Sequence, residues 1–374
     1  MWGATVQDAR SWTPDAILLI RKGELPLSAL RRFLLFSYER PAPFVPSPAA
    51  GGGSALPRVL QDGKLSISHS TRVLPCIALD YPVLNRIPVS DANQTGHSSQ
   101  NWKATVAYDG TDFRGWQVQP GERTIQGELQ GAIERVTGEA PLPQGSGRTD
   151  AGVHALGQVA SFPLAAAIPA ANLLRALNRT LPDAIRVLDV RVVPDGFHAR
   201  HSAVAKTYEY RVFLERPGWP ATQESQFVLC PPFLARYVFA CPWPLDLAAL
   251  QVAAGHLVGE HDFTSFAASD PDLSNRAEDG EPVNPVRTIF ESRWTAKATD
   301  EGTILVYRVR GSGFLHHMVR NLVGTMIDAG RGYTQPDGIQ AILAARSRSA
   351  AGPTAPARGL FLHSVEYGET EFRP

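Results

Sequence analysis

Apolar and polar residues follow two kinds of pattern along this chain. From Trp102 onward, short runs in which apolar residues alternate with polar ones are separated by longer stretches with apolar residues every three or four positions. The first pattern is typical of half-buried strands and the second of amphipathic helices. Because the two kinds follow one another with mixed connections, the chain is predicted to have an α+β fold.

The predicted strands are rich in β-branched and aromatic residues, and several end at turn signals such as Asp109-Gly110. They cover residues 103–108, 155–162, 185–193, 207–213, 290–297, 303–310 and 360–365. The predicted helices cover residues 125–137, 170–178, 245–257, 314–329 and 336–346. The helix over 314–329 has the clearest apolar stripe, and Gly330 predicts its end. Arg320 and Asn321 lie off that stripe, free to face solvent or a site.

Residues 1–100 have a different composition from the rest of the chain. The proline-rich run 41–48 leads into three glycines at 51–53, and residues 90–100 are polar throughout. Such a segment buries too little apolar surface to offset the entropy that ordering costs. We therefore expect residues 1–100 to be a mostly disordered N-terminal extension, with one short helical stretch near 15–38.

The overall composition is that of a soluble globular protein. The chain has 374 residues, of which 44% are hydrophobic and 19% charged. It contains no run of 18 apolar residues, and its start lacks the basic and apolar regions of a signal peptide, so a cytoplasmic protein is predicted. Cys76, Cys230 and Cys241 are odd in number and form no CxxC pair, so neither a disulfide framework nor a thiolate metal site is predicted.

The charges balance overall but not locally. A formal net charge of zero argues mildly against a nucleic-acid partner. Residues 171–216, however, contain eight basic and five acidic residues, and residues 308–331 contain four arginines and one aspartate. These two segments predict either a basic surface that binds phosphates or charges scattered over a solvated surface.

The most chemically dense stretch is the glycine-rich run 147–154. It places Arg148, Thr149, Asp150 and His154 between glycines, as expected of a tight polar loop exposed to a ligand. An aspartate in such a loop often only forms a turn. An arginine two residues away can instead keep the carboxylate ionised and aimed, as a nucleophile or general base requires. Thr149 and His154 receive no role from the sequence.

Three other groups of residues have alternative interpretations. Tyr208, on the strand predicted over 207–213, is either a core residue or a ring that stacks on a base. His256 and His261 have HxxxEH spacing, which matches neither zinc helix motif, so a structural role is favoured for both. His316 and His317 are adjacent and would point about 100° apart on a helix, so they are not expected to bind one ion.

The loop and six further segments resemble, in order, the motifs of the TruA family of tRNA pseudouridine synthases. The matching segments are GSGRTDAGVH (145–154), YDGTDFRGWQ (108–117), LNRTLP (177–182), FHAR (197–200), KTY (206–208), EHDFTSF (260–266) and FLHHMVRN (314–321). The resemblance spans about 102 to 367, and the first hundred residues lie outside it. Such a set of ordered segments is specific to this family.

The resemblance implies a homodimer whose subunits have two similar α/β-sandwich subdomains, with antiparallel sheets, flanking a central basic cleft. By position, residues 101–200 would form the N-terminal catalytic subdomain, residues 201–368 the C-terminal one and residues 369–374 a tail. The implied reaction converts uridine to pseudouridine at positions 38 to 40 of the tRNA anticodon stem-loop, without a metal or an organic cofactor.

The same resemblance implies roles for individual residues. Asp150 would be the catalytic aspartate, Arg148 its partner, and Tyr208 the active-site tyrosine that contacts the base. Lys206, Arg200 and Arg320 would bind the substrate with Tyr208. Two alternatives remain at this point: a noncatalytic tRNA-binding or tRNA-folding protein on the same scaffold, and a metal-dependent hydrolase that uses His256 and His261.

Overall fold

The computed structural model describes residues 99–216, 228–268 and 284–368. The predicted N-terminal extension, up to residue 98, lies outside these residues, as do the tail 369–374 and part of the proline-rich connection. All described residues belong to one compact unit of the chain. Within them, no helix has both the length and the apolar character needed to cross a membrane.

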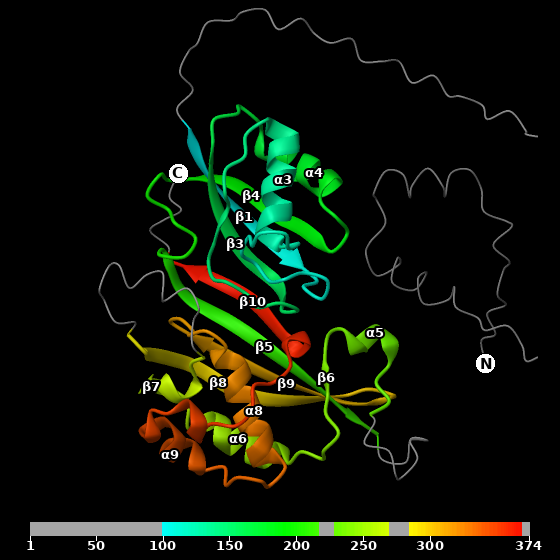
Figure 1. The fold of residues 1–374 in the computed structure, drawn as a ribbon, viewed down its shortest axis with the longest axis vertical. Helices are drawn as coiled ribbons and strands as arrows, with labels where there is room; N and C mark the ends of the chain where they lie inside the picture. Colours follow the sequence, from blue (N-terminus) through cyan, green and yellow to red (C-terminus); the bar gives the residue numbers. More distant parts are fainter. Residues whose placement is uncertain (1–98, 217–227, 269–283, 369–374) are drawn as a thin grey trace, which may run out of the picture. The chain divides into compact units, whose positions relative to one another are not determined.

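A single ten-stranded sheet runs through this unit, in the order β4-β1-β3-β10-β5-β9-β8-β7 (Figure 1). Short strand β2 pairs with β3, and β6 pairs with β5. The strands are β1 (Gln100–Tyr108), β2 (Gln144–Gly145), β3 (His154–Leu164), β4 (Ile185–Val193), β5 (Ala203–Glu215), β6 (Phe239–Ala240), β7 (Gly259–Asp262), β8 (Val286–Ala298), β9 (Gly302–Gly311) and β10 (Leu360–Tyr367). Most neighbours are antiparallel, and the helices alternate irregularly with the strands, so the α+β prediction is confirmed.

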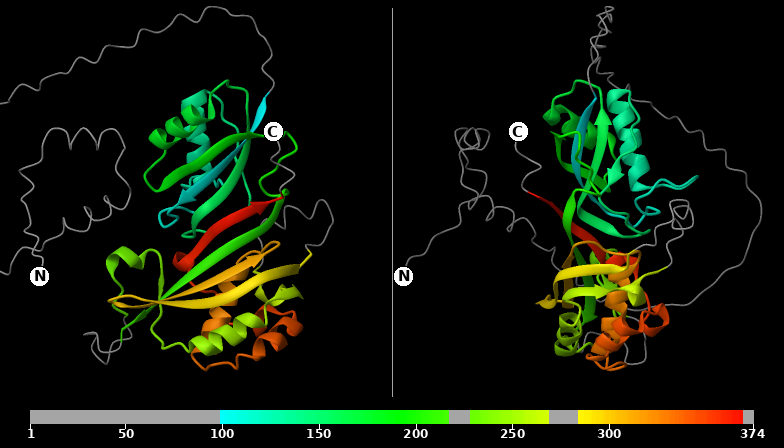
Figure 2. Two further views of the ribbon diagram at one scale, coloured as in Figure 1. Left: turned by 180° about the vertical axis from the view of Figure 1, so that it is seen from behind. Right: turned by 90° about the vertical axis from the view of Figure 1, so that its left-hand side faces the viewer.

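Strand β10 joins the two halves of the sheet. The strands from residues 100–193 lie on one side of it and those from residues 203–311 on the other (Figures 1 and 2). β10 pairs antiparallel with β5 and parallel with β3, where Phe361 is opposite His154. The C-terminal strand therefore lies beside the residue that ends the glycine-rich loop. The subdomain boundary at residue 200 stays a prediction.

Helices pack on both parts of the sheet. They are α3 (Ile125–Thr137), α4 (Ala170–Thr180), α5 (Pro232–Ala235), α6 (Leu247–Gly255), α8 (Met318–Gly330) and α9 (Gly338–Ala345). Helix α3 has the predicted ends, because the Thr124 side chain accepts a hydrogen bond from the Gly127 N–H and Gly138 takes the left-handed conformation. Helix α6 packs against α8 and β8.

Helix α8 is almost completely buried. Of its residues only Arg320 is not fully buried, and Asn321, expected to face solvent or a site, has no exposed surface. That expectation was wrong because loops cover the helix on the side away from the sheet: the Asn321 amide donates to the Phe266 carbonyl and accepts from the Thr354 hydroxyl. A buried amide is tolerated because these hydrogen bonds satisfy it.

The start of α8 also differs from the prediction. The helix begins at Met318, four residues after the predicted start at Phe314. His317 immediately before it has a φ of 57°, in the left-handed region that residues other than glycine seldom adopt. The apolar periodicity continues across this position, so the pattern alone does not reveal the break.

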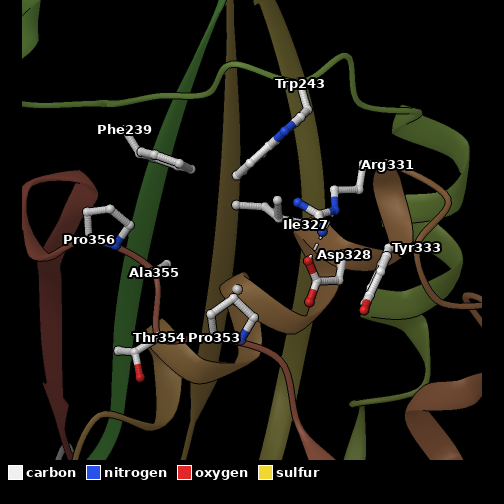
Figure 3. A pocket seen from close by; sticks show the side chains of 11 residues that line it. Phe239, Trp243, Ile327, Asp328, Arg331, Tyr333, Pro353, Thr354, Ala355 and Pro356 are labelled. Atoms are coloured by element: carbon white, nitrogen blue, oxygen red, sulfur yellow. Dashed lines mark ion pairs between the residues drawn. The ribbon is translucent and has the colours of Figure 1, made fainter. Parts of the chain in front are cut away.

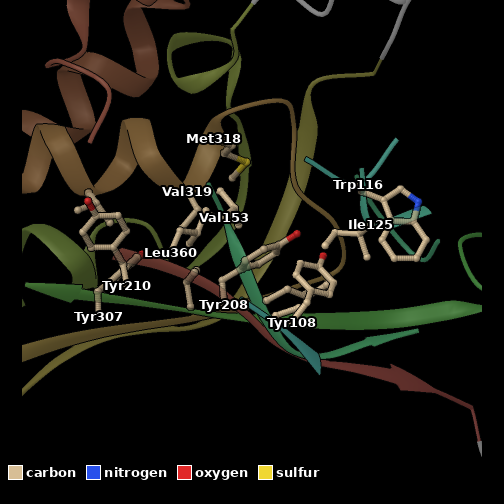
Figure 4. Packing of buried hydrophobic residues seen from close by; sticks show 14 of the residues in the cluster. Tyr108, Trp116, Ile125, Val153, Tyr208, Tyr210, Tyr307, Met318, Val319 and Leu360 are labelled. Atoms are coloured by element: carbon tan, nitrogen blue, oxygen red, sulfur yellow. The ribbon is translucent and has the colours of Figure 1, made fainter. Parts of the chain in front are cut away.

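One hydrophobic core connects the two parts of the sheet. Tyr108, Trp116 and Ile125 belong to it from one part, and Tyr307 and Met318 from the other (Figure 4). All five side chains are at most 4% exposed. The core therefore fixes the position of α8 relative to the strands that precede and follow the glycine-rich loop.

A close backbone contact holds the segment before β10 against α8. A Cβ atom on Gly324 would lie only 1.7 Å from the carbonyl oxygen of Pro353. The neighbouring Thr325 hydroxyl accepts a hydrogen bond from the Gly352 N–H. The helix and the segment around Pro353 can approach this closely only because residue 324 has no side chain.

We predict that Gly324→Ala destabilises the protein by about 1–3 kcal/mol, because the added methyl group must displace the backbone at Pro353. Chemical denaturation would measure the free energy of unfolding. Gly338→Ala is the matched control, because no atom lies within 4 Å of the added Cβ in α9, and it should leave stability unchanged or slightly higher. Equal stability of both variants would contradict the packing described for Gly324.

Candidate active site

The loop that carries Asp150 is held rigidly between β2 and β3. The Ser146 hydroxyl donates to the Gln158 side chain at 2.7 Å, and the Gln158 amide donates to the Gly147 carbonyl at 2.8 Å. The hydroxyls of Thr149 and Tyr108 form a buried hydrogen bond of 2.8 Å. Thr149 received no role from the sequence. In the structure, its hydrogen bond to Tyr108 fixes the backbone directly before Asp150.

The segment 108–117, which contains Gly110 and Gly115, packs against the glycine-rich loop. The Trp116 N–H donates to the Thr149 carbonyl at 3.0 Å, and a Cβ on Gly115 would lie 2.6 Å from that oxygen. A Cβ on Gly110 would meet the Val153 carbonyl at 1.9 Å. The two motifs at 108–117 and 145–154 are therefore packed backbone against backbone, which explains why the first needs glycine at positions 110 and 115.

His154 ties the end of the loop to distant parts of the chain. Its Nδ1 lies 3.2 Å from the Gly110 N–H, and its Nε2 lies 3.1 Å from the Arg236 carbonyl and 3.2 Å from the Arg358 carbonyl. Burial lowers the pKa of His154, although Asp109 opposes the shift. The ring is therefore neutral at pH 7, with the proton placed on Nε2, where two carbonyls accept it.

The Asp150 carboxylate is surrounded by basic side chains from the start of α8. The Arg320 guanidinium donates to Oδ2 at 2.8 Å, and the Nε2 atom of His317 lies 3.3 Å from the same oxygen. The Nε2 atom of His316 lies 3.7 Å from Oδ1. The Asp150 side chain is 21% exposed and that of Arg320 is 15% exposed, so the pair is largely withdrawn from water without being closed off.

Arg320 is itself fixed by the backbone. Its Nε donates to the Ala355 carbonyl at 2.8 Å, and the Ala355 N–H donates to the Arg320 carbonyl at 3.0 Å. One guanidinium thus bridges the segment before β10 and the Asp150 carboxylate. A planar, always charged guanidinium suits this double contact better than an ammonium would.

His316 and His317 do not behave as two residues of one helix. Their ring centroids are 3.9 Å apart, because His317 precedes α8 and has a left-handed backbone. One ligand atom from each, together with one from Asp150, lies within 4.8 Å of the others, the arrangement of a group that can hold a metal ion. The prediction that the two rings point about 100° apart on one helix was therefore wrong, whereas the absence of a metal stays a prediction. Any cation there would compete with Arg320 for Oδ2.

The other pair of histidines has structural contacts of its own. The Nε2 atom of His256 lies 2.9 Å from Asp337, and that of His261 lies 3.1 Å from the Val258 carbonyl. Within the part of the chain that the structure describes, Asp150, His316 and His317 form the only group with metal-ligand geometry. A zinc centre built on His256 and His261 is not supported by these contacts.

Tyr208 is a core residue, and its predicted contact with a base stays a prediction. Its side chain is 8% exposed, belongs to the main core, and packs edge-on against Phe314 with ring centroids 5.0 Å apart. Burial raises the pKa of the Tyr208 phenol, and the nearby Asp150 carboxylate and Tyr108 phenol raise it further. Figure 4 shows Tyr208 next to Tyr108. The phenol is thus a buried, protonated group close to Asp150.

The remaining predicted residues lie around the same loop. The Lys206 ammonium donates to the Ser146 carbonyl at 2.5 Å. Arg148 and Arg200 are exposed. The expected pairing of Arg148 with Asp150 and the expected contact of Arg200 with substrate stay predictions, whereas the structure adds Arg320 as a direct partner of Asp150.

A cavity of about 370 Å³ lies at the other end of α8 (Figure 3). It contains Asp328 paired with Arg331 at 3.3 Å, and the Arg331 guanidinium lies over the rings of Trp243 and Tyr333. None of the residues predicted for the site lines this cavity. The chemistry of the glycine-rich loop is therefore separate from it.

Comparison with known proteins agrees with this geometry. The family model described as tRNA pseudouridine synthase matches residues 104–202 and 253–368, which include the glycine-rich loop and α8 but not β5. The chain belongs to the tRNA pseudouridine synthase family. The resemblance of the sequence motifs to this family is thereby confirmed, and membership makes the chain an RNA-modifying isomerase.

Curated relatives match over nearly their full length. The tRNA pseudouridine synthase A of Solibacter usitatus is 51% identical over 262 residues, which are 70% of this chain and 97% of the relative. Those of Maridesulfovibrio salexigens and Bacillus subtilis are 43% and 42% identical, over 72% and 71% of this chain and 92% and 98% of their own. The family model likewise begins only at residue 104 of this chain.

Several site contacts were not predicted from the sequence. The contact of His316 and His317 with Asp150 depends on the left-handed backbone at His317, and the anchoring of Arg320 depends on Ala355. The histidine pair itself was visible in FLHHMVRN (314–321), but no spacing rule places it opposite residue 150.

We predict a pH-dependent effect of His154→Gln on stability. At pH 7.5 the variant should be about 1–3 kcal/mol less stable, because buried partners lose hydrogen bonds. His154 has a lowered pKa in the fold, so its contribution is present above the unfolded-state pKa and is lost as the pH falls below it. The difference between wild type and variant in the free energy of unfolding, measured with urea, should therefore become smaller as the pH falls from 7.5 to 5.

The surface variant His261→Gln is the control for this measurement, and its small gap should not depend on pH in the same way. A His154→Gln gap that stays constant or widens toward pH 5 would contradict a neutral, buried His154.

Proposed function

We propose that this protein isomerises uridine to pseudouridine at positions 38 to 40 of the tRNA anticodon stem-loop, with Asp150 as nucleophile or base. The observation that carries the proposal is the Asp150 carboxylate, held by a rigid loop and faced by Arg320 at 2.8 Å. Family membership supports the class of reaction and of substrate. The chemistry proposed uses only side chains of the protein.

The reaction requires one carboxylate in an ionised, oriented state. The bond from N1 of uracil to C1′ of the ribose breaks, the base turns over, and C5 bonds to C1′. The C5 proton then leaves and N1 takes up a proton, so that atoms and charge balance. Asp150 can assist either by bonding to C1′ or by removing a proton from C2′, and the Arg320 guanidinium stabilises the charged carboxylate for both.

Tyr208 contributes as a protonated phenol. Because burial raises the pKa of its hydroxyl, it is a poor acceptor for the C5 proton at neutral pH. It is suited to packing against the uracil ring, with Phe314 supporting it from the edge. A buried phenol next to Asp150 also helps to exclude water while the base is detached.

The tRNA backbone would be held by cations around the loop. Arg148, Arg200 and Lys206 lie on or next to the segments that carry Asp150 and Tyr208, and Arg320 contacts Asp150. Such contacts place the stem-loop without reading its sequence, while the target nucleotide is extruded from the stack. We further propose that the protein acts in the cytoplasm as a homodimer with a basic cleft, as the family motifs imply.

Release of tritium from tRNA labelled at C5 of uridine tests this function. Wild-type protein should release tritium into water, and Asp150→Asn should release none while it still binds tRNA, because only the ionised carboxylate is lost. Asp183→Asn removes a fully exposed carboxylate and is the matched control, with release at the wild-type rate. Release by Asp150→Asn at the wild-type rate would contradict the role given to Asp150.

A further inference from the structure

Lys206 and Tyr208 lie on the same face of β5, two residues apart. In the register of β5 with β9, Lys206 is opposite Gly311 and Tyr208 is opposite Val309. Side chains two residues apart on a strand point to the same side, about 7 Å from each other. Lys206 therefore lies one step along the strand from the phenol next to Asp150.

The Lys206 ammonium is only partly satisfied by the protein. It donates one hydrogen bond, to the Ser146 carbonyl at 2.5 Å, and its Nζ lies 3.2 Å from the position of a Cβ on Gly147. Among the residues that the structure describes, no carboxylate pairs with it and no acceptor takes its other two N–H groups. A half-buried ammonium with open donors is a site for an anion.

A second cation without a carboxylate lies nearby on β8. The Arg287 Nε lies 3.4 Å from the position of a Cβ on Gly313, in the segment that leads from β9 to Phe314. Its guanidinium donates to the Asn284 and Val286 carbonyls, and no carboxylate in the described ranges forms an ion pair with it. Arg287 was not among the residues predicted from the sequence.

The charges around Lys206 all have the same sign. Burial lowers the pKa of Lys206 to about 8, and the positive charges of Arg200 and Arg287 contribute to the shift. The other groups that contact it, the backbone of Ser146 and Gly147 and the opposite residue Gly311, carry no charge. Lys206 and Arg287, which have no carboxylate partner among the described residues, repel each other until an anion binds.

We propose that Lys206 and Arg287, with Arg200 at the edge, bind one phosphate of the RNA backbone next to the nucleotide whose base enters the site beside Tyr208. The inference rests on the proposed function and adds a phosphate subsite to it. Phosphate oxygens can accept charge-assisted hydrogen bonds from the remaining N–H groups of the Lys206 ammonium. Because Lys206 also holds the Ser146 carbonyl, the phosphate is connected directly to the loop that carries Asp150.

This phosphate site makes RNA binding depend on pH. The free protein loses the Lys206 proton near pH 8, whereas a bound phosphate favours the charged ammonium. RNA binding above pH 8 is therefore coupled to proton uptake, and affinity falls as the pH rises. With full recovery of the Lys206 charge in the complex, the Kd should rise about eightfold between pH 7.5 and 9.

The test measures the Kd of the full chain for unmodified tRNA by fluorescence anisotropy between pH 7 and 9 at constant ionic strength. Wild-type protein should show the rise in Kd. Lys206→Arg should bind with little change over this range, because a guanidinium keeps its proton. Arg287→Gln removes one repelling cation, so it should weaken binding and move the midpoint of the pH response to higher pH.

Lys297→Arg, an exposed lysine on β8, is the matched control and should keep the wild-type response to pH. A Lys206→Arg variant with the same pH response as wild type, or a wild-type Kd that is flat to pH 9, would overturn the proposal.

Tritium release separates this inference from the proposed function. Normal release with pH-independent binding removes the phosphate site alone. Absent release with the predicted pH response removes the proposed reaction and leaves the phosphate site in place.

Discussion

The ion pair between Asp150 and Arg320 joins residues 170 positions apart and is the contact on which the site depends. Both side chains are largely withdrawn from water, so the loss of either partner would leave the other as an uncompensated charge. The pair therefore requires that the glycine-rich loop and the start of α8 stay in fixed positions. Much of the fold serves that requirement.

Each partner is supported by close backbone packing rather than by side chains alone. On the Asp150 side, Gly110 and Gly115 let a neighbouring segment contact the loop directly. On the Arg320 side, Gly324 lets the segment around Pro353 lie against α8, and Ala355 then binds the arginine. A guanidinium fixed in this way needs no reorganisation when charge develops at the carboxylate.

The parallel pairing of β10 with β3 brings the two supports together. Phe361 lies opposite His154 and stacks on its ring with centroids 4.7 Å apart. The same imidazole contacts the carbonyls of Arg236 and Arg358, so residues from four parts of the chain meet at the end of the loop. The position of the site next to the junction of the sheet follows from this pairing.

Local features of the fold were predictable from the sequence because local physics determines them. Thr124 and Gly138 mark the ends of α3 as expected, and the strand around Tyr208 follows its alternating pattern. Asp150 stood out through its loop, and the family motifs gave expected roles to Tyr208 and Arg320, which the strand and helix patterns had already marked. The break before Met318, the burial of Asn321 and the contacts of His154 were not predictable, because they depend on residues up to 204 positions away.

We propose that Arg320 holds the Asp150 carboxylate in its reactive state. The single-turnover rate of pseudouridine formation by Arg320→Gln, with the tRNA Kd measured in parallel, tests this role. We expect a rate roughly a hundredfold below wild type, with a Kd that changes much less, because the lost interaction acts on the reacting carboxylate. A wild-type rate in Arg320→Gln, or a loss confined to tRNA binding, would contradict it.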